Sequence, residues 1–230
     1  MTTSSSKNFE LDVAEYIEEA FERCGLELRT AYDLKTAKRS LNLLLAEWAN
    51  RGLNQWTISQ TAIALTQGTT SYSLDATNPT AVIDVLDAFI RRTTNGTASD
   101  LQMNQISRSE YAAVPDKASQ GRPSQYFVDK QISPVIYLFN TPENSTDVLY
   151  VNRLMRMDDV DASTNTLEMP FRFYPCLSAG LAYYLSLKKA PERTGMLKQL
   201  YEEEFQRALS QDEDRASFRA TPDLRSYNYA

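Results

Sequence analysis

The chain has 230 residues, of which 42% are hydrophobic, and a formal net charge of -6. That length and apolar content suit one large globular domain, or one domain interrupted by another. The absence of histidine excludes the usual general base, the Ser-His-Asp arrangement and the common zinc sites. The acidic balance argues against a general nucleic-acid binder, which normally carries a basic excess or a basic stripe.

The sequence carries no sign of a membrane segment or a secretory signal. No apolar run reaches the roughly 20 residues that span a bilayer, and the start, MTTSSSKNFE, lacks an apolar core. We therefore expect no membrane contact and synthesis in the cytosol. Cys24 and Cys176 fall on apolar helical faces, so buried thiols are expected rather than a disulfide.

Two amphipathic helices are predicted before residue 56. From Phe9, apolar residues recur at helical spacing until Gly25, and the opposite face is acidic. The second helix starts at the capping-box pattern of Thr30 and Asp33 and ends at Gly52, because glycine readily takes the left-handed conformation after a last turn. Its apolar stripe comprises Leu34, Ala37, Leu41, Leu44, Leu45 and Trp48. Because only a few residues join the two helices, they should pack as an antiparallel pair.

The segment 56–169 has the pattern of an antiparallel β domain. Apolar and polar residues alternate in short runs at 56–65, 126–128, 135–139 and 148–155, with turn residues between them. Asn95-Gly96, which follows the apolar run 82–93, is the strongest hairpin signal in the chain. This spacing predicts a compact antiparallel sheet or a small barrel.

Two further helices are predicted after this segment. Pro170 and Pro175 fit only near a helix start, and one side of the helix that follows carries Leu177, Leu181, Tyr184, Leu185 and Lys188. A break at Ala190-Pro191 leads to the last helix, whose acidic runs EEE and QDED should face water. Its apolar face is predicted to comprise Met196, Leu197, Leu200, Tyr201, Phe205, Ala208 and Leu209.

These elements predict an α+β fold. Two helices before the β region and two after it can bury their stripes only against each other. We therefore expect a four-helix bundle formed by residues 1–55 and 170–214, with the antiparallel β domain of residues 56–169 inserted between helices two and three.

The last residues, 215–230, are predicted to form an extended C-terminal tail. They contain Pro222 and no helical stripe, and they interleave arginines with apolar and aromatic residues that disordered tails usually lack. These residues are Arg215, Phe218, Arg219, Leu224, Arg225, Tyr227 and Tyr229. A frayed terminus is the simpler interpretation, whereas docking onto a neighbouring chain explains the aromatic residues.

No catalytic or metal-binding arrangement stands out. The 7 glycines are too scattered for a phosphate-binding loop. Asp158, Asp159 and Asp161 form the densest acidic cluster outside the helices, and such carboxylates could serve a glycosidase or bind calcium. They lack the spaced ligands and the glycine of a calcium loop, so a solvated loop is the simpler interpretation. We expect no catalytic residue, no metal and no cofactor.

Three short pieces accompany this order of elements. They are Ala46-Glu47-Trp48 with Gly52 at the close of the second helix, the turn Gly121-Arg122-Pro123, and the helix end from Leu181-Ala182 to Pro191. In these pieces and in its order of elements, the chain resembles the head-to-tail adaptor proteins of short-tailed bacteriophages, also called tail tubular protein A. None of the pieces is a catalytic motif.

The resemblance implies a structural virion protein at the head-tail junction, made in the host cytoplasm. Such a protein would form a dodecameric ring that joins the portal to the tail nozzle and fibres and extends the DNA channel. DNA would pass through the lumen without specific binding, because an acidic wall does not hold phosphates. From the composition of the tail we further hypothesise that residues 215–230 lie in a groove of the portal, with aromatic anchors and with arginines paired to acidic portal residues.

Two other classes of function stay open. A polysaccharide-hydrolysing tail enzyme would need a carboxylate pair, and loss of turnover on changing Asp158 or Asp161 would favour it. A carbohydrate-binding module would act through residues 56–169 alone, because the chain's 13 tyrosines and 2 tryptophans could form a sugar-stacking surface.

Overall fold

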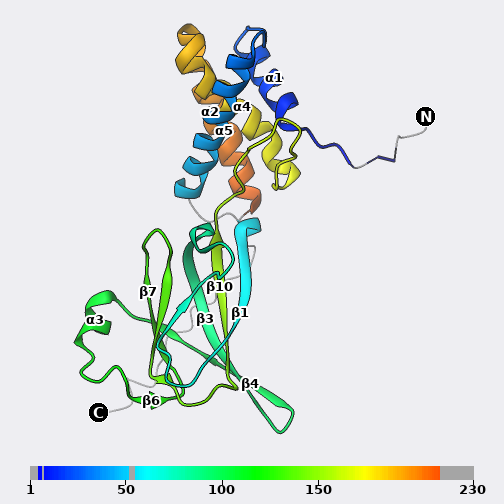
Figure 1. The fold of residues 1–230 in the computed structure, drawn as a ribbon. Coiled ribbons are helices and arrows are strands. Elements are labelled where there is room, and N and C mark those ends of the chain that lie inside the picture. Colours follow the sequence, from blue (N-terminus) through cyan, green and yellow to red (C-terminus); the bar gives the residue numbers. More distant parts are fainter. Residues whose placement is uncertain (1–4, 7, 52–54, 213–230) are drawn as a thin grey trace, which may run out of the picture.

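The computed structural model describes residues 5–6, 8–51 and 55–212. Gly52, where the second helix is predicted to end, and the whole predicted tail, 215–230, lie outside the described residues. The chain is a mixture of helices and mainly antiparallel sheets, so the predicted α+β class is confirmed. Figure 1 shows the long helices at one end of the molecule and the strands at the other.

The helical end contains four of the helices. They are α1 (Val13–Arg23), α2 (Ala31–Arg51), α4 (Tyr174–Lys189) and α5 (Thr194–Asp212). A shorter helix, α3 (Arg108–Ala113), belongs to the strand-rich end (Figure 1). Single 3-10 turns precede β1, β3, α4 and α5, at η1 (Gln55–Thr57), η2 (Pro79–Ala81), η3 (Phe171–Phe173) and η4 (Pro191–Arg193).

Local side chains fix where the first helices begin and end. Asp12 and Glu15 form a full capping box at the start of α1, and Gly25 takes a φ of +71° just after its end. At α2 the hydroxyl of Thr30 accepts from the Asp33 N–H at 3.2 Å, as expected. The carboxylate of Asp33, however, pairs with Lys189 instead of closing the box.

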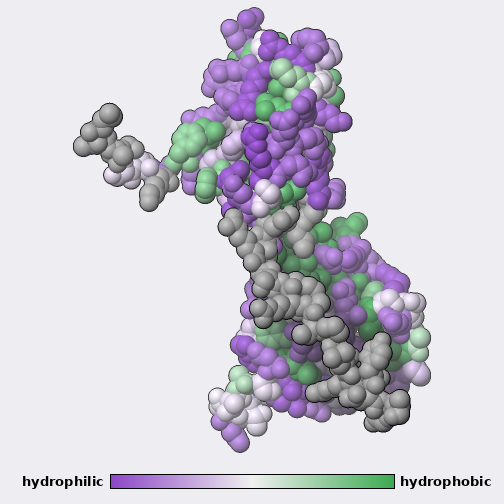
Figure 2. Space-filling model, turned by 180° about the vertical axis from the view of Figure 1, so that it is seen from behind, coloured by the Kyte–Doolittle hydropathy of each residue, from purple (hydrophilic) through white to green (hydrophobic). Residues whose placement is uncertain are grey.

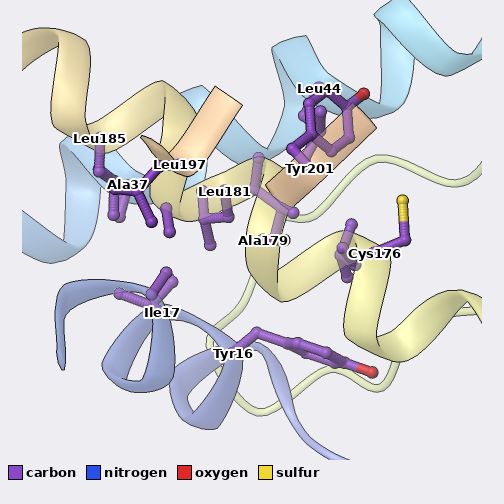
Figure 3. Packing of buried hydrophobic residues seen from close by; sticks show 14 of the residues in the cluster. Tyr16, Ile17, Ala37, Leu44, Cys176, Ala179, Leu181, Leu185, Leu197 and Tyr201 are labelled. Atoms are coloured by element: carbon purple, nitrogen blue, oxygen red, sulfur yellow. The ribbon is translucent and has the colours of Figure 1, made fainter. Parts of the chain in front are cut away.

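One cluster of buried apolar side chains joins these helices. Figure 3 shows Ile17 of α1, Leu44 of α2, Leu181 of α4 and Tyr201 of α5 converging on a common core. Each fully buried leucine contributes roughly 1.5–3 kcal/mol. The segment after the strands also belongs to this core, since Val160 is buried in it.

Two details of α5 differ from the sequence prediction. Met196 and Leu200 were expected on the apolar face, but their residues are 64% and 36% exposed. Asp212, expected to face water, is only 7% exposed because it pairs with Arg172. The buried face of α5 is therefore narrower than the apolar face that the sequence predicts.

In the described part of the chain, the strands form two four-stranded sheets and one two-stranded sheet. The first sheet has the order β1-β10-β3-β4 and is antiparallel throughout, with β1 (Ile58–Ala64), β3 (Val82–Thr94), β4 (Thr97–Gln102) and β10 (Val148–Met155). The second has the order β2-β8-β7-β5, with β2 (Ser71–Ser73), β5 (Asn104–Gln105), β7 (Gln125–Asp129) and β8 (Val135–Phe139). The third pairs β6 (Gln120–Gly121) with β9 (Thr141–Pro142).

Among the strands that the structure describes, the pairing is antiparallel with two short exceptions. The predicted hairpin is confirmed: Asn95 and Gly96 have φ of 51° and 78° and connect β3 to β4. The pairs β5–β7 and β6–β9 are parallel, which the sequence analysis did not anticipate. A second apolar cluster, containing Leu74, Val85, Ile136 and Leu149, draws its side chains from both four-stranded sheets.

Candidate functional site

A polar cluster locks α2 against α4 and α5. The indole N–H of Trp48 donates to the Tyr201 hydroxyl at 2.8 Å, and the neighbouring Glu47 accepts from the Tyr184 hydroxyl at 2.8 Å. Arg51, one turn further along, donates to Glu47 and places two nitrogens at 2.8 Å from the two oxygens of Glu202. Ala46-Glu47-Trp48, a piece of the family resemblance, is therefore a packing motif.

The charges in this cluster stabilise one another. The pKa of Glu202 is lowered because Arg51 donates to its carboxylate. The same bond raises the pKa of the Arg51 guanidinium further above its ordinary value. Burial, together with the bond to Glu47, raises the pKa of Tyr184 to about 12. Glu202, Arg51 and Tyr184 therefore each keep one protonation state near neutral pH. Their bonds to one another and to Glu47 hold α2 against α4 and α5.

A second polar contact lies where the helices meet the first strand. The Asp212 carboxylate, in the last turn of α5, accepts from the Gln55 backbone N–H at 3.0 Å and from the Arg172 guanidinium. Trp56 packs on Phe173 with ring centroids 4.4 Å apart. These contacts hold the end of α5 beside the start of β1 and the start of α4.

The turn Gly121-Arg122-Pro123 also has a structural role. The Arg122 guanidinium donates to the Ile90 carbonyl at 3.3 Å and to the Ser99 carbonyl at 3.1 Å, which ties the turn to the β3–β4 hairpin. A Cβ on Gly121 would lie 3.1 Å from the Asn140 side-chain nitrogen. A larger residue would therefore have to displace that amide.

The aspartate cluster lies on a loop after β10. Asp158, Asp159, Asp161 and Glu168 line one open hollow of about 560 Å³. Asp159 pairs with Arg156 at 3.2 Å and Asp161 accepts from the Asn165 amide at 2.6 Å. Among the described residues, no group of three histidine, cysteine or acidic side chains is placed to hold a metal ion. The hollow is a solvated acidic surface in this arrangement.

One flank of the helical end carries an acidic groove with an apolar floor. The groove has a volume of about 450 Å³ and lies between α1 and the start of α4. Its apolar lining comprises Phe9, Leu11, Tyr174 and Pro175, and its acidic lining comprises Glu15, Glu18, Glu19 and Glu22. Seen from behind, an apolar area stands out beside the N-terminal segment on a mainly hydrophilic helical end (Figure 2).

A second groove of the helical end has the opposite charge. Its volume is about 500 Å³, and it is lined by Lys35, Lys38, Arg39, Asn42, Leu43, Arg156 and Asp159. Leu43 stands 55% exposed among these cations. Figure 1 places α1 on one side of the helical end and α2 on the other, and the two grooves share no lining residue.

The comparison with protein families decides which class of protein these surfaces serve. Residues 11–225 match the model of the SU10 adaptor protein family. The chain belongs to this family of phage head-to-tail adaptors. The predicted resemblance to head-to-tail adaptors is thereby confirmed. A search of curated proteins found no match.

Membership makes this adaptor a structural component of the virion that interacts with other head and tail proteins. The family is one of structural proteins, which agrees with the expectation that the chain is not an enzyme. No helix in the described part of the adaptor is both long and apolar enough to cross a membrane.

The adaptor's predicted portal-binding residues cannot be placed, because 215–230 lie outside the described residues. The junction contact of Arg172 with Asp212 was missed, since the two residues are far apart in sequence and one is in an acidic run. The acidic face of the first helix was predicted, but the groove beside it and the basic groove on α2 were missed for a similar reason. The helical spacing of Glu18 and Glu22, and of Lys35 and Arg39, was the available signal.

Proposed function

We propose that the adaptor forms a dodecameric ring at the head-tail junction, where it joins the portal to the tail nozzle and fibres and extends the DNA channel. The observation that carries this proposal is the family match over residues 11–225. The net charge of -6 supports a conduit without specific DNA binding, because wall cations would retain phosphates and slow the DNA during ejection.

In this proposal the helical end is a four-helix bundle of residues 1–55 and 170–214 that builds the ring. Residues 56–169 are an inserted β domain that is turned toward the tail. Two observations support the division: the helices and the strands have separate apolar clusters, and all four long helices contribute to the first. The last part of the segment 56–169 packs on the helices, because Val160 is buried in the first cluster and Met157, Leu167 and Met169 pack against it.

The C-terminal residues 215–230 are proposed to dock in a groove of the portal. Phe218, Leu224 and Tyr227 would act as anchors, and Arg219 and Arg225 would pair with acidic portal residues. The contacts of Asp212 support this, because they fix the last described residue of α5 beside Gln55 and Arg172. Ordering each anchor costs conformational entropy. The free energy gained by burying the aromatic side chains must exceed that cost.

Electron microscopy of virions tests the proposed function, with the adaptor expected as a ring beneath the portal. A pull-down then compares the full chain with a variant ending at Asp214 for binding to purified portal. We expect the shortened variant to lose most portal binding. A third variant, in which Phe218, Leu224 and Tyr227 are changed to serine in the full chain, separates loss of the anchors from loss of length. Equal binding by all three would refute the docking role.

A further inference from the structure

We propose that the acidic groove on α1 receives the basic face of α2 from the next copy of the adaptor. This inference rests on the proposed ring and names the surfaces that would close it. The partner is a second copy of the same chain, and the contact joins two different surfaces of each copy.

The acidic groove keeps two carboxylates uncommitted. Glu15 caps the Asp12 N–H at 2.9 Å, and Glu19 pairs with Arg23 at 2.7 Å. Glu18 and Glu22 are exposed and form no hydrogen bond or ion pair within the residues that the structure describes. They are four residues apart, so they stand on neighbouring turns of one helical face.

The basic face of α2 has the complementary arrangement. Lys38 donates to the Asp161 carbonyl at 2.9 Å, and Arg156 pairs with Asp159 at 3.2 Å. Lys35 and Arg39 are exposed, and no partner for either is found in the described part of the chain. They too are four residues apart, so two cations at the spacing of one helical turn face two carboxylates at the same spacing.

Apolar side chains accompany the charges on both sides. Phe9 is 72% exposed at the acidic groove, and Leu43, one turn after Arg39 on α2, is 55% exposed. Covering both removes apolar area from water, while the charges favour one orientation and oppose groove-to-groove contact. The grooves are lined by different helices, α1 and α2, so each copy can offer one groove to the copy before it and the other to the copy after it. Head-to-tail contacts of that kind generate rings when the rotation closes.

Charge reversal in virions tests the contact. The paired change Glu18→Lys and Glu22→Lys should lower the yield of virions carrying an adaptor ring by about tenfold or more, because like charges then face each other. The pair Lys35→Glu and Arg39→Glu should do the same. Combining all four changes in one chain should restore the yield, and so should supplying the two paired variants together, since each then complements the other.

A matched control distinguishes an effect of the groove residues from an effect of the changed net charge. Glu192 and Glu203 are exposed on η4 and α5, outside both grooves, and Glu192→Lys with Glu203→Lys changes the net charge equally. This control should assemble like the unchanged chain. A loss equal to that of the groove variants would overturn the inference, as would the failure of the fourfold variant to recover.

Cross-linking gives an independent measurement on assembled particles. A chain with Glu18→Cys and Lys35→Cys, treated with a short bismaleimide, should yield a ladder of adaptor oligomers, because each copy then links to two neighbours. The native thiols, Cys24 and Cys176, are buried and give no background. A ring at the junction without a ladder would overturn the inference and leave the proposed function intact. Particles whose junction lacks the adaptor would refute the proposed function itself.

Discussion

Replacing Gly180 with alanine tests how closely the helices approach at the centre of the helical end. A Cβ at this position of α4 would lie 2.8 Å from a ring carbon of Tyr201 on α5 and 2.9 Å from a methyl of Leu44 on α2. Both distances are well below ordinary van der Waals contact, so one neighbour must move. Tyr201 cannot move cheaply, because its hydroxyl accepts from Trp48 and its ring stacks on Tyr183 at 6.1 Å.

The net effect follows from two opposing terms. Alanine is favoured over glycine in a helix interior by about 1 kcal/mol. Overpacking a core by one methyl group costs about 1–3 kcal/mol. Since the clash involves two helices at once, we expect Gly180→Ala to lower the free energy of unfolding by about 1–2 kcal/mol. For a chain of this size, each kcal/mol corresponds to a fall in Tm of about 2–4 °C.

Thermal unfolding followed by far-ultraviolet circular dichroism measures this effect against a matched change. Gly195 lies in the first turn of α5, and a Cβ there would meet no atom within 4 Å. Gly195→Ala should therefore leave Tm unchanged or raise it. If Gly180→Ala stabilised the chain as much as Gly195→Ala, the described packing of α2 and α5 on α4 would be wrong.

Three further predictions concern the polar groups and the thiols. Tyr201→Phe should lower the free energy of unfolding by about 1–3 kcal/mol, because the buried Trp48 N–H loses its acceptor, whereas Tyr183→Phe should have little effect in the same urea titration. Glu202 has a pKa below its ordinary 4.5 because Arg51 donates to it, so its contribution to stability is present above 4.5 and is lost as the pH falls through the lower folded pKa. Glu202→Gln should accordingly weaken the loss of stability on acidification, measured as the urea midpoint against pH. The 2 cysteines should not react with a thiol reagent in the native chain and should both react after unfolding, because both thiols are buried.

Several features that local chemistry decides were predicted accurately from the sequence, whereas the capping role of Asp33 and the positions of Met196 and Leu200 on α5 were not. The strands 135–139 and 148–155 and the Asn95-Gly96 hairpin are confirmed, because period-two alternation and left-handed turn residues act over a few positions. The buried state of the cysteines is confirmed for the same reason, since helical spacing had placed both on apolar faces.

Features that depend on distant residues could not be predicted in this way. The partner of Asp33 is Lys189, and the partner of Asp212 is Arg172, and nothing near either aspartate in the sequence indicates the pairing. The parallel pairs β5–β7 and β6–β9 are two residues long, which is too short for any periodic signal. The candidate interaction surfaces could not be predicted either. A groove forms where elements pack together, whereas the periodic pattern predicts each element separately.

The charges of the helical end divide into two groups with different physical consequences. Arg51 of α2 pairs with Glu47 of its own helix and with Glu202 of α5, so these charges hold the two helices together. The uncommitted pairs, Glu18 with Glu22 and Lys35 with Arg39, do the opposite in an isolated chain. Like charges four residues apart on a helix repel each other by a few tenths of a kcal/mol. A neighbouring copy that brings the opposite charges turns that repulsion into attraction, so side chains that weaken each helix alone would favour assembly of the ring.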